Sequence, residues 1–462
     1  MLVRMLDRKS GVPLYEQIYR HVLDEIGRGA LPAGARMPSR RELSARLGCS
    51  PVTVDAAYAQ LVAEGYLQAR ERSGHFVLST GFPAPARRSA TVVAEVPFAV
   101  PRYDLGTAAF DADLFPYAVW TRIVRETLRE PKSELLNAGH PQGSRALREA
   151  IAEHLAAQRG FSPDPADIVV GAGSEYLIGQ LVELIGREPL YAVEDPGYPK
   201  IARIVASHGA RPVGIPLDGA GLDVTALRTS GADIVHVTPS HQFPTGVVMP
   251  VGRRRELLAW AQDGDRLILE DDYDSEFRFA GQPIPALAGL DGGDRVVYLN
   301  SFTKSLAPAL RIAYMVLPPR LLSTYRERLG HYSCTVSNIE QETLSRFMAE
   351  GHFERHLARV RKTCRDRRDR FLDRLLASPI GNRLSVRSED AGLHFVLSVD
   401  LGRSEADLVA AAERHGVRLA GLSRFGPPPS FEPVPRVVVG YAGLAGADVE
   451  GAVDALVRSW SE

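Results

Sequence analysis

Cysteine is scarce in this sequence of 462 residues, and the scarcity limits the kinds of site that the chain can hold. The three cysteines, Cys49, Cys334 and Cys364, are odd in number and far apart. They form neither a disulfide framework nor a metal-binding pattern, and they fit a reducing cytoplasm. Because no ligand-spaced cluster of His and Cys occurs elsewhere, the sequence predicts no structural metal.

Long apolar runs and a strong net charge are missing as well. No segment approaches the unbroken apolar run of a membrane span, and residues 1–9 hold no apolar core followed by a cleavage site. The sequence therefore predicts neither a membrane span nor a signal peptide, and we expect a cytoplasmic protein. A net charge of −1 excludes bulk attraction to nucleic acid, but residues 1–80 contain 11 Lys+Arg and 8 Asp+Glu, a local net charge of +3.

The chain divides into three segments by pattern, and its length suits two or three domains. Residues 1–79 alternate helical patterns with tight turns, and residues 80–103 are rich in Pro, Ala and Val, as is typical of a linker. From residue 104 onward, apolar strands alternate with amphipathic helices, which predicts an α/β fold with a mostly parallel sheet. The candidate buried strands are 168–170, 234–237, 267–269 and 296–299.

The first 79 residues contain the pattern of a winged helix-turn-helix. Apolar residues recur on one helical face over 14–28. Ser39 and Glu42 predict a capping box for a second helix that ends near Gly48, and Ser50-Pro51 predicts the start of a third, running to about residue 64. Two short helices joined by a tight turn are typical of a helix-turn-helix, and residues 70–77 predict a basic hairpin wing.

The string 38–43, together with 47–50 and 64–67, closely resembles the GntR family of winged helices over residues 12–78. The resemblance implies that Arg41, the start of the third helix and the wing contact double-stranded DNA. Pro51 and Asp55 stand where some relatives carry arginines, which leaves Thr53 as a nearby base contact. The arginines are candidates for phosphates, which position a protein without specifying sequence. For any one arginine alone, an ordinary solvated surface role remains open. The DNA-binding candidates are Arg40, Arg41, Ser50, Thr53, Arg70, Arg72, Gly74 and His75.

A glycine-rich turn at 171–175 lies between a strand and a helix. Its residues Gly173, Ser174 and Glu175 would bring backbone N–H groups of a helix start close to a phosphate. Such turns are also common in α/β folds that bind nothing, so both interpretations remain open at this point.

Acidic, phenolic and amine groups follow two of the predicted strands. Asp271 and Tyr273 follow 267–269; an acid beside a pyridine nitrogen and a phenol beside a 3′-oxygen are what pyridoxal 5′-phosphate (PLP) requires. Ser301, Thr303 and Lys304 follow 296–299. A lysine at the end of a buried strand is unusual, and desolvation lowers the pKa of its amine, as a Schiff-base nucleophile needs.

With the strings 194–198 and 238–246, these residues resemble fold-type I PLP-dependent enzymes, the aspartate aminotransferase superfamily. The closest resemblance is to regulators of the MocR/GabR type, over nearly the whole chain. It implies a winged helix at 1–79 and an aminotransferase-like domain at 104–462 with helices on both sheet faces and a smaller α+β subdomain at about 320–462. It also implies that Lys304 forms the Schiff base, that Arg436 clamps an effector carboxylate, and that PLP is bound by Asp271, Tyr273, Tyr198, Gly173, Ser174, Glu175, Ser301, Thr303 and Arg311.

Two positions depart from the aminotransferase pattern. Phe243 stands where aminotransferases usually have asparagine, and Ala138 where they have a tyrosine that reaches the phosphate across the dimer. Both changes remove polar contacts to the cofactor, which lowers the expected rate of transamination while leaving the Schiff-base chemistry intact.

The resemblance implies a PLP-dependent transcription regulator that senses an amino compound, or PLP itself, through an aldimine at Lys304. It further implies a homodimer with winged heads exchanged head to tail and operators of direct or inverted repeats. The alternative is a catalytically active aminotransferase with an autoregulatory DNA-binding head; a regulator that has lost PLP is opposed by the intact set of candidate residues. GABA, taurine, another amine and PLP itself remain open as effectors, with Lys200 as a further candidate contact.

Overall fold

The computed structural model describes residues 6–8, 10–79, 101–130, 132–279, 284–387, 391–427 and 434–462. The chain forms two compact units, residues 1–98 and 99–462. Of the expected linker 80–103, residues 80–100 lie outside the described residues. Its last expected residue, Tyr103, instead belongs to the second unit, where β3 (Tyr103–Asp104) pairs with β14 (Val417–Arg418).

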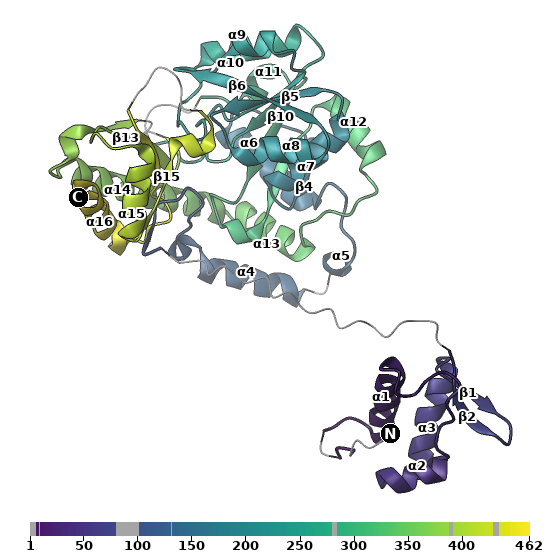
Figure 1. Cartoon of the computed structure of the whole chain (residues 1–462). Helices are drawn as coiled ribbons and strands as arrows, with labels where there is room; N and C mark the ends of the chain where they lie inside the picture. The colour runs from purple at the N-terminus through teal and green to yellow at the C-terminus, as the bar shows by residue number, and fades with distance from the viewer. Residues whose placement is uncertain are drawn as a thin grey trace. The chain divides into compact units, whose positions relative to one another are not determined.

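The N-terminal unit has the three helices and the hairpin that its sequence predicts (Figure 1). Apolar residues from α1 and α3 form its core, with Ile18 and Val22 buried against Val54 and Leu61. The hairpin pairs its two strands in antiparallel register. The elements are α1 (Leu14–Gly27), α2 (Arg40–Leu47), α3 (Pro51–Ala63), β1 (Leu67–Arg70) and β2 (Gly74–Val77).

Local side-chain chemistry sets the helix boundaries of this unit. Ser39 Oγ accepts from the Glu42 amide at 3.2 Å and caps α2, and Gly48 ends that helix with a φ of 62°. Only this half of the expected capping box is found, because the Glu42 carboxylate binds Arg46 one turn later.

An eight-stranded sheet lies at the centre of the C-terminal unit (Figure 1). Its strand order is β4-β11-β10-β9-β8-β5-β6-β7; the run from β10 to β6 is parallel, whereas β11 and β7 are antiparallel to their neighbours. The mostly parallel sheet is thereby confirmed. The strands are β4 (Ile168–Gly171), β5 (Leu190–Asp195), β6 (Arg211–Asp218), β7 (Gly221–Leu222), β8 (Ile234–Val237), β9 (Leu267–Asp271), β10 (Val296–Ser301) and β11 (Ala313–Val316).

Successive residues of the central strands face opposite layers of helices. In β10, Val297 and Leu299 belong to a core formed with α7, α8 and α12, whereas Tyr298 belongs to a core formed with α6 and α13. Both faces are covered, as the nearly continuous apolar strands predict. The covering helices are α6 (Arg145–Gln158), α7 (Ser174–Ile185), α8 (Pro199–Ser207), α9 (Val224–Thr229), α10 (Val251–Gln262), α11 (Leu287–Asp291), α12 (Pro319–Arg328) and α13 (Asn338–Ala349).

A second core lies around a four-stranded antiparallel sheet of order β12-β13-β16-β15. It includes Tyr103, Leu105, Leu114 and Phe277, and its remaining buried residues start at Val360. Helices α12 and α13, which the expected subdomain at about 320–462 would include, pack on the large sheet instead. The elements are β12 (Leu384–Arg387), β13 (His394–Val399), β15 (Ala420–Gly421), β16 (Arg436–Gly440), α15 (Glu405–Arg414) and α16 (Val449–Ser461).

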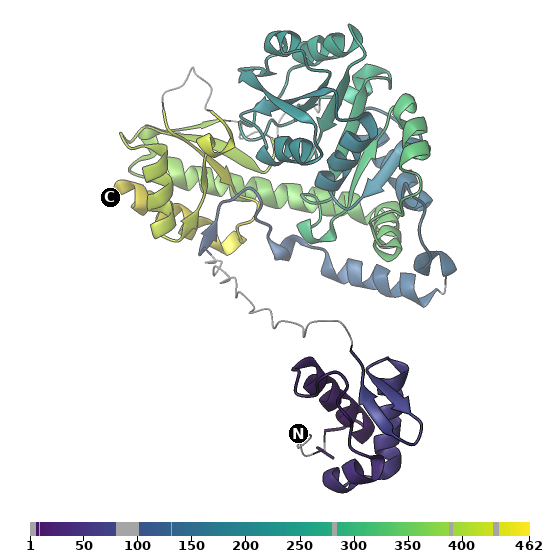
Figure 2. The same cartoon turned by 45° about the vertical axis from the view of Figure 1, so that its right-hand side comes forward.

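One long helix, α14 (His352–Leu376), joins the two cores (Figure 2). Its first turns bury Phe353 and Leu357 in a large-sheet core, and its later turns bury Val360 and Phe371 in the smaller one. The smaller sheet is therefore fixed to the large one through a continuous helix.

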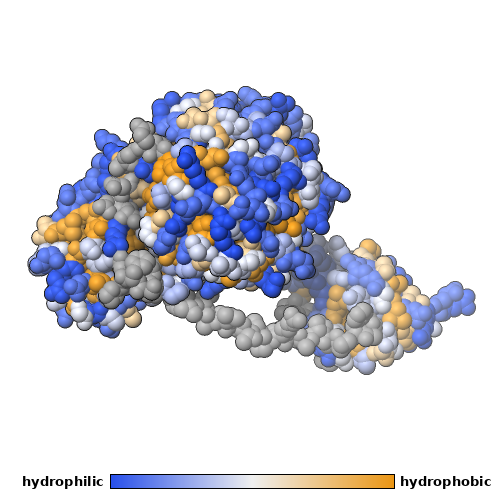
Figure 3. Space-filling model, turned by 90° about the horizontal axis from the view of Figure 1, so that it is seen from above, coloured by the Kyte–Doolittle hydropathy of each residue, from blue (hydrophilic) through white to orange (hydrophobic). Residues whose placement is uncertain are grey.

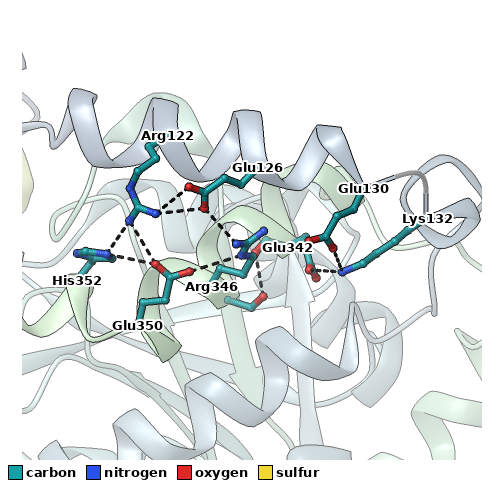
Figure 4. Close-up of polar contacts among 9 residues, drawn as sticks. Arg122, Glu126, Glu130, Lys132, Glu342, Arg346, Glu350 and His352 are labelled. Carbon is teal, nitrogen blue, oxygen red and sulfur yellow. Dashed lines mark hydrogen bonds and ion pairs between the residues drawn. The ribbon is translucent and has the colours of Figure 1, made fainter.

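Helix α4 (Tyr117–Arg129), with the short α5 (Ser133–Leu136) after it, is fastened along α13 by charged side chains (Figure 4). Arg122 contacts Glu126 at 3.0 Å and Glu350 at 3.3 Å, and Arg346 contacts Glu126 at 3.2 Å. Each exposed pair stabilises little alone, but the shared partners form a network. Elsewhere the surface seen in Figure 3 is mostly hydrophilic, with separate apolar areas.

Candidate functional site

The carboxyl ends of the parallel strands bring predicted residues of the C-terminal unit to one edge of the large sheet, whereas Arg436 belongs to the smaller sheet. β9 ends at Asp271 and β10 at Ser301, and these strands are neighbours in parallel register. Ligands of open α/β sheets bind outside this edge. The position of the candidate site thus follows from the topology.

Lys304 lies three residues beyond β10 and is withdrawn from solvent. Its Nζ donates to the Thr107 carbonyl at 2.5 Å. Burial lowers the pKa of the Lys304 amine, and the Asp274 carboxylate opposes that change. Lys132, Lys200 and Lys362 are exposed and Lys304 is half-buried, so Lys304 is the least exposed lysine of the described residues.

Asp271 is buried with one carboxylate oxygen directed to a histidine and the other without a partner. Its Oδ2 lies 3.4 Å from His236 Nε2 on β8, whereas its Oδ1 has no hydrogen-bond partner among the described residues. An unpaired buried carboxylate oxygen is costly unless a ligand satisfies it. His236 was not among the predicted residues; a lone histidine within a buried strand was the available signal.

Tyr273 is a hydrogen-bond donor at this edge. Its hydroxyl donates to the His241 carbonyl at 3.1 Å, and burial together with Asp274 and Asp271 raises its pKa well above the usual value. The phenol therefore keeps its proton throughout the physiological range.

The glycine-rich turn at 171–175 lies against the guanidinium group of Arg311. Gly173 has a φ of 98°, and a Cβ built there would lie 2.4 Å from Arg311 Nη2, so the close approach requires glycine. Ser174 and Glu175 belong to the first turn of α7, whose N–H groups have no acceptor within the helix. The Glu175 carboxylate accepts from Lys200 at 2.6 Å, so its contribution to an anion site would come from its amide.

Aromatic rings of three segments far apart in the chain pack on one another. Tyr198, 40% exposed, meets Phe243 edge to face with centroids 5.6 Å apart, and Phe243 packs in the same manner on Phe425 at 5.0 Å. Ser301 is buried at the end of β10, and Thr303 is half-buried beside Lys304. Arg436 opens β16 opposite Ser398 and is 6% exposed.

Sequence reasoning also missed a buried cluster of His241, Asp274 and His394. Their donor atoms lie within 4.8 Å of one another, and His241 Nδ1 is 2.8 Å from Asp274 Oδ2. By residue type the three could hold a metal ion. They come from segments far apart in the chain, so spacing in the sequence gave no signal.

The predicted DNA-binding arginines of the N-terminal unit differ in their partners. Arg40 is paired with Asp55 at 2.6 Å, whereas Arg41 is exposed and has no ion pair among the described residues. Arg70 lies over the Phe76 ring at 4.6 Å, and Arg72 at the hairpin tip has a φ of 58°.

Three other predicted DNA contacts are engaged within the unit. Ser50 Oγ accepts from the Thr53 amide at 3.2 Å and lies 2.8 Å from Thr53 Oγ1. His75 packs on Tyr58 at 5.0 Å, and burial and Arg40 lower its pKa, so it is neutral at pH 7.

Arg36, which the sequence analysis did not single out, lies beside the hairpin. Gly74 has a φ of 104°, and a Cβ there would lie 3.7 Å from Arg36 Nε. Arg36 is exposed and bridges to Phe76 of β2. Arg36 precedes the capping box, where no sequence motif marks a functional residue.

Comparison with known proteins accounts for both units. Residues 14–77 match the gntR family of bacterial regulatory proteins, and residues 106–456 match the aminotransferase class I and II family. A probable rhizopine catabolism regulatory protein, MocR of Rhizobium meliloti, is 32% identical over 95% of this chain and 92% of its own. The chain belongs to the MocR-type transcription regulators.

Other MocR-type relatives cover the chain as fully. An uncharacterized HTH-type transcriptional regulator of Bacillus subtilis, YdeL, is 35% identical over 98% of both chains. The pyridoxine biosynthesis regulator PdxR of Corynebacterium glutamicum is 33% identical over 89% of this chain and 88% of its own. The resemblance expected from the sequence is thus confirmed, and the N-terminal unit of this MocR-type chain is a GntR-type DNA-binding module.

Solved structures share the fold of the C-terminal unit. Kynurenine aminotransferase of Pyrococcus horikoshii, solved in complex with PMP, has a TM-score of 0.67 at 23% identity, covering 79% of this chain and 91% of its own. The MocR-type chain therefore has the fold-type I aminotransferase fold. Among its described residues, no helix is both long and apolar enough to cross a bilayer.

Proposed function

We propose that this regulator binds PLP at Lys304 and that the occupant of this site sets its affinity for operator DNA. The observation that carries the proposal is the convergence of a half-buried amine with a lowered pKa, an unpaired buried carboxylate oxygen and an arginine-lined glycine turn at one sheet edge. Transcription regulators with the same two-unit organisation support the DNA-binding half.

The residues present fit the chemical groups of PLP. Asp271 Oδ1 is available to a pyridine nitrogen, and the Tyr273 hydroxyl could donate to a phenolate oxygen by turning away from the His241 carbonyl. Arg311 and the amides of Ser174 and Glu175, with Ser301 and Thr303, suit a phosphate. When bound, PLP supplies an aldehyde that condenses reversibly with amines.

Each side chain then has a definite task. Burial favours the neutral, nucleophilic form of the Lys304 amine, and the Thr107 carbonyl holds that amine in place. Asp271, steadied by His236, would keep a proton on the pyridine nitrogen. Phe243 offers no polar contact, so the site favours binding of an amine over rapid turnover.

The effector is an amino compound or PLP itself. Arg436, buried at the start of β16, is the candidate for an effector carboxylate. Lys200 is the second candidate, and an acidic effector would have to compete with Glu175 for it. An effector that contacts the two arrangements of the chain differently would shift the balance between them and so change DNA affinity.

We further propose that the regulator acts as a homodimer with winged heads exchanged head to tail. Large apolar side chains on α4 and α5 support an interface there: Tyr117, Leu128 and Leu136 are exposed despite their size.

The test is the visible spectrum of purified protein before and after borohydride, followed by mass analysis of the lysine peptides. We expect a yellow band that borohydride removes and a reduced cofactor on the Lys304 peptide. Lys304→Ala should lose both, while Lys200→Ala, with a nearby exposed lysine replaced, should keep both. No band even after added PLP would contradict the proposal. Sustained conversion of amino acids to 2-oxo acids would instead support a working aminotransferase.

A further inference from the structure

Val52 is an exposed apolar side chain at the start of the DNA-reading helix. It lies in the first turn of α3, directly after Pro51, and is 77% exposed. In helix-turn-helix proteins the first residues of the second helix contact base edges in the major groove. Single exposed valines are common on protein surfaces, so the inference depends on the neighbours of Val52.

The polar side chains of the same turn are already engaged within the module. Thr53 Oγ1 is 2.8 Å from Ser50 Oγ, which also caps the helix. The Asp55 carboxylate is 2.6 Å from Arg40 Nη1. Reading a base with either group would require breaking a contact that the free module makes.

The rest of α3 offers no other side chain of the kinds that ordinarily read bases. The helix contains no Arg, Lys or Asn, and the amide of its only glutamine, Gln60, donates to Glu64 at 3.0 Å. These are the side chains that ordinarily bind guanine and adenine edges. Ala56 and Ala59 are exposed on the same side as Val52 and permit close approach to the floor of a groove.

Charge complementarity identifies the occupant of this face as duplex DNA. Arg36, Arg41, Arg70 and Arg72 are exposed, and none has an acidic partner among the described residues. By contrast, Arg20 on α1 and Arg28 directly after it are each paired with an acid one turn away. These four cations belong to the segment before α2, to α2 itself and to the hairpin.

We propose that Val52 is a specificity-determining residue that reads the C5-methyl group of a thymine in the operator. Apolar contact with that methyl distinguishes thymine from the other bases in the major groove. The unpaired arginines bind phosphates and fix the register of the helix. The proposal rests on the DNA-binding function proposed above and adds the chemistry by which sequence is read.

The experiment uses the full-length protein and a duplex that it selects from a random library. Each thymine of that duplex is replaced in turn by uracil, which lacks only the methyl group, and affinity is measured by fluorescence anisotropy at fixed salt. At one thymine per half-site we expect a loss of about fourfold, the value of one buried methyl-sized group. With Val52→Ala, uracil at that position should cost nothing further.

Two outcomes would overturn the proposal: no thymine at which uracil weakens binding, or the same uracil penalty in Val52→Ala. Because Val52 is exposed, its replacement should leave the thermal midpoint unchanged. Arg41→Ala serves as the matched control, since it should weaken every duplex alike and preserve the uracil penalty. Failure to select any duplex would instead contradict DNA binding itself, so the two failures are distinguishable.

Discussion

Arginines of the N-terminal module lie exposed without acidic partners at 36, 41, 70 and 72, whereas Arg159 and Arg254, behind the sheet edge of the candidate cofactor site, are buried and bonded within the protein. Arg159 lies 2.7 Å from Asp272, and Arg254 donates to the carbonyls of Met249, Pro285 and Pro239. The same side chain thus serves two purposes. An exposed arginine remains available to a phosphate, whereas a buried arginine holds loops in place behind a sheet edge.

The buried pair also orients the neighbouring carboxylate. Successive residues of a strand point to opposite sides, so fixing Asp272 to Arg159 and Tyr298 directs Asp271 toward the candidate site. In the described chain the two non-glycine residues with positive φ are Arg72 and Arg311, one in each candidate site. Such conformations cost energy and persist where the surroundings impose them.

Replacing Arg159 should produce the largest effect, because it leaves Asp272 buried without its counter-ion. For Arg159→Met we expect the C-terminal unit to lose about 3–5 kcal/mol of unfolding free energy, measured by denaturant titration. Arg122→Met, which removes an exposed networked arginine, is the control and should change stability little. Equal losses in the two variants would contradict the distinction between buried and exposed arginines.

Glu276 should make the stability of the C-terminal unit depend on pH. Burial raises the pKa of this carboxyl to about 7, so the folded state holds its proton more tightly than the unfolded state. Its contribution to stability is complete below the unfolded pKa, near 4.3, and is lost as the pH rises through 7.

Glu276→Gln should therefore flatten the decline in stability between pH 5 and pH 7.5, by at most about 3 kcal/mol. Thermal midpoints across that range provide the measurement, with Glu256→Gln on the surface as the control. Parallel curves for wild type and Glu276→Gln would show that Glu276 does not titrate as described.

Arg41→Ala should weaken DNA binding without affecting stability. We expect a loss of roughly fivefold that is independent of sequence, and a decrease of about one in the slope of log affinity against log salt concentration. Anisotropy titrations at several salt concentrations measure both. An unchanged slope would exclude Arg41 as a phosphate contact.

The paired Arg40 and Asp55 should give the smallest effect. Replacing both by alanine removes no net charge, so DNA affinity should change by less than about twofold. Asp55→Ala alone should tighten binding slightly, since it releases Arg40. A large loss in the double variant would mean that Arg40 leaves Asp55 to bind DNA.

The sequence predicted those features of the fold that depend on residues close together in the chain. Ser39, Ser50 and Gly48 mark helix boundaries through bonds to residues a few positions away, and alternating apolar residues mark strands such as β9 and β10. The sequence also placed Lys304 and Asp271 after neighbouring strands, whose ends meet at one edge of a parallel sheet, and their role there stays a prediction.

The features that the sequence did not predict depend on contacts between residues far apart in the chain. His236 faces Asp271 only because β8 and β9 pair in parallel register, and His241, Asp274 and His394 meet only in the folded chain. The boundary of the smaller core was displaced because amphipathic helices such as α12 and α13 do not reveal which sheet they cover.

The most direct test of the central claim is operator binding by one preparation in three states: as purified, stripped of cofactor with hydroxylamine, and reloaded with PLP. We expect stripping to change affinity by at least about fivefold, reloading to restore it, and Lys304→Ala to respond to neither treatment. Identical isotherms for the stripped and reloaded wild-type protein would contradict the claim that the occupant of Lys304 governs DNA binding.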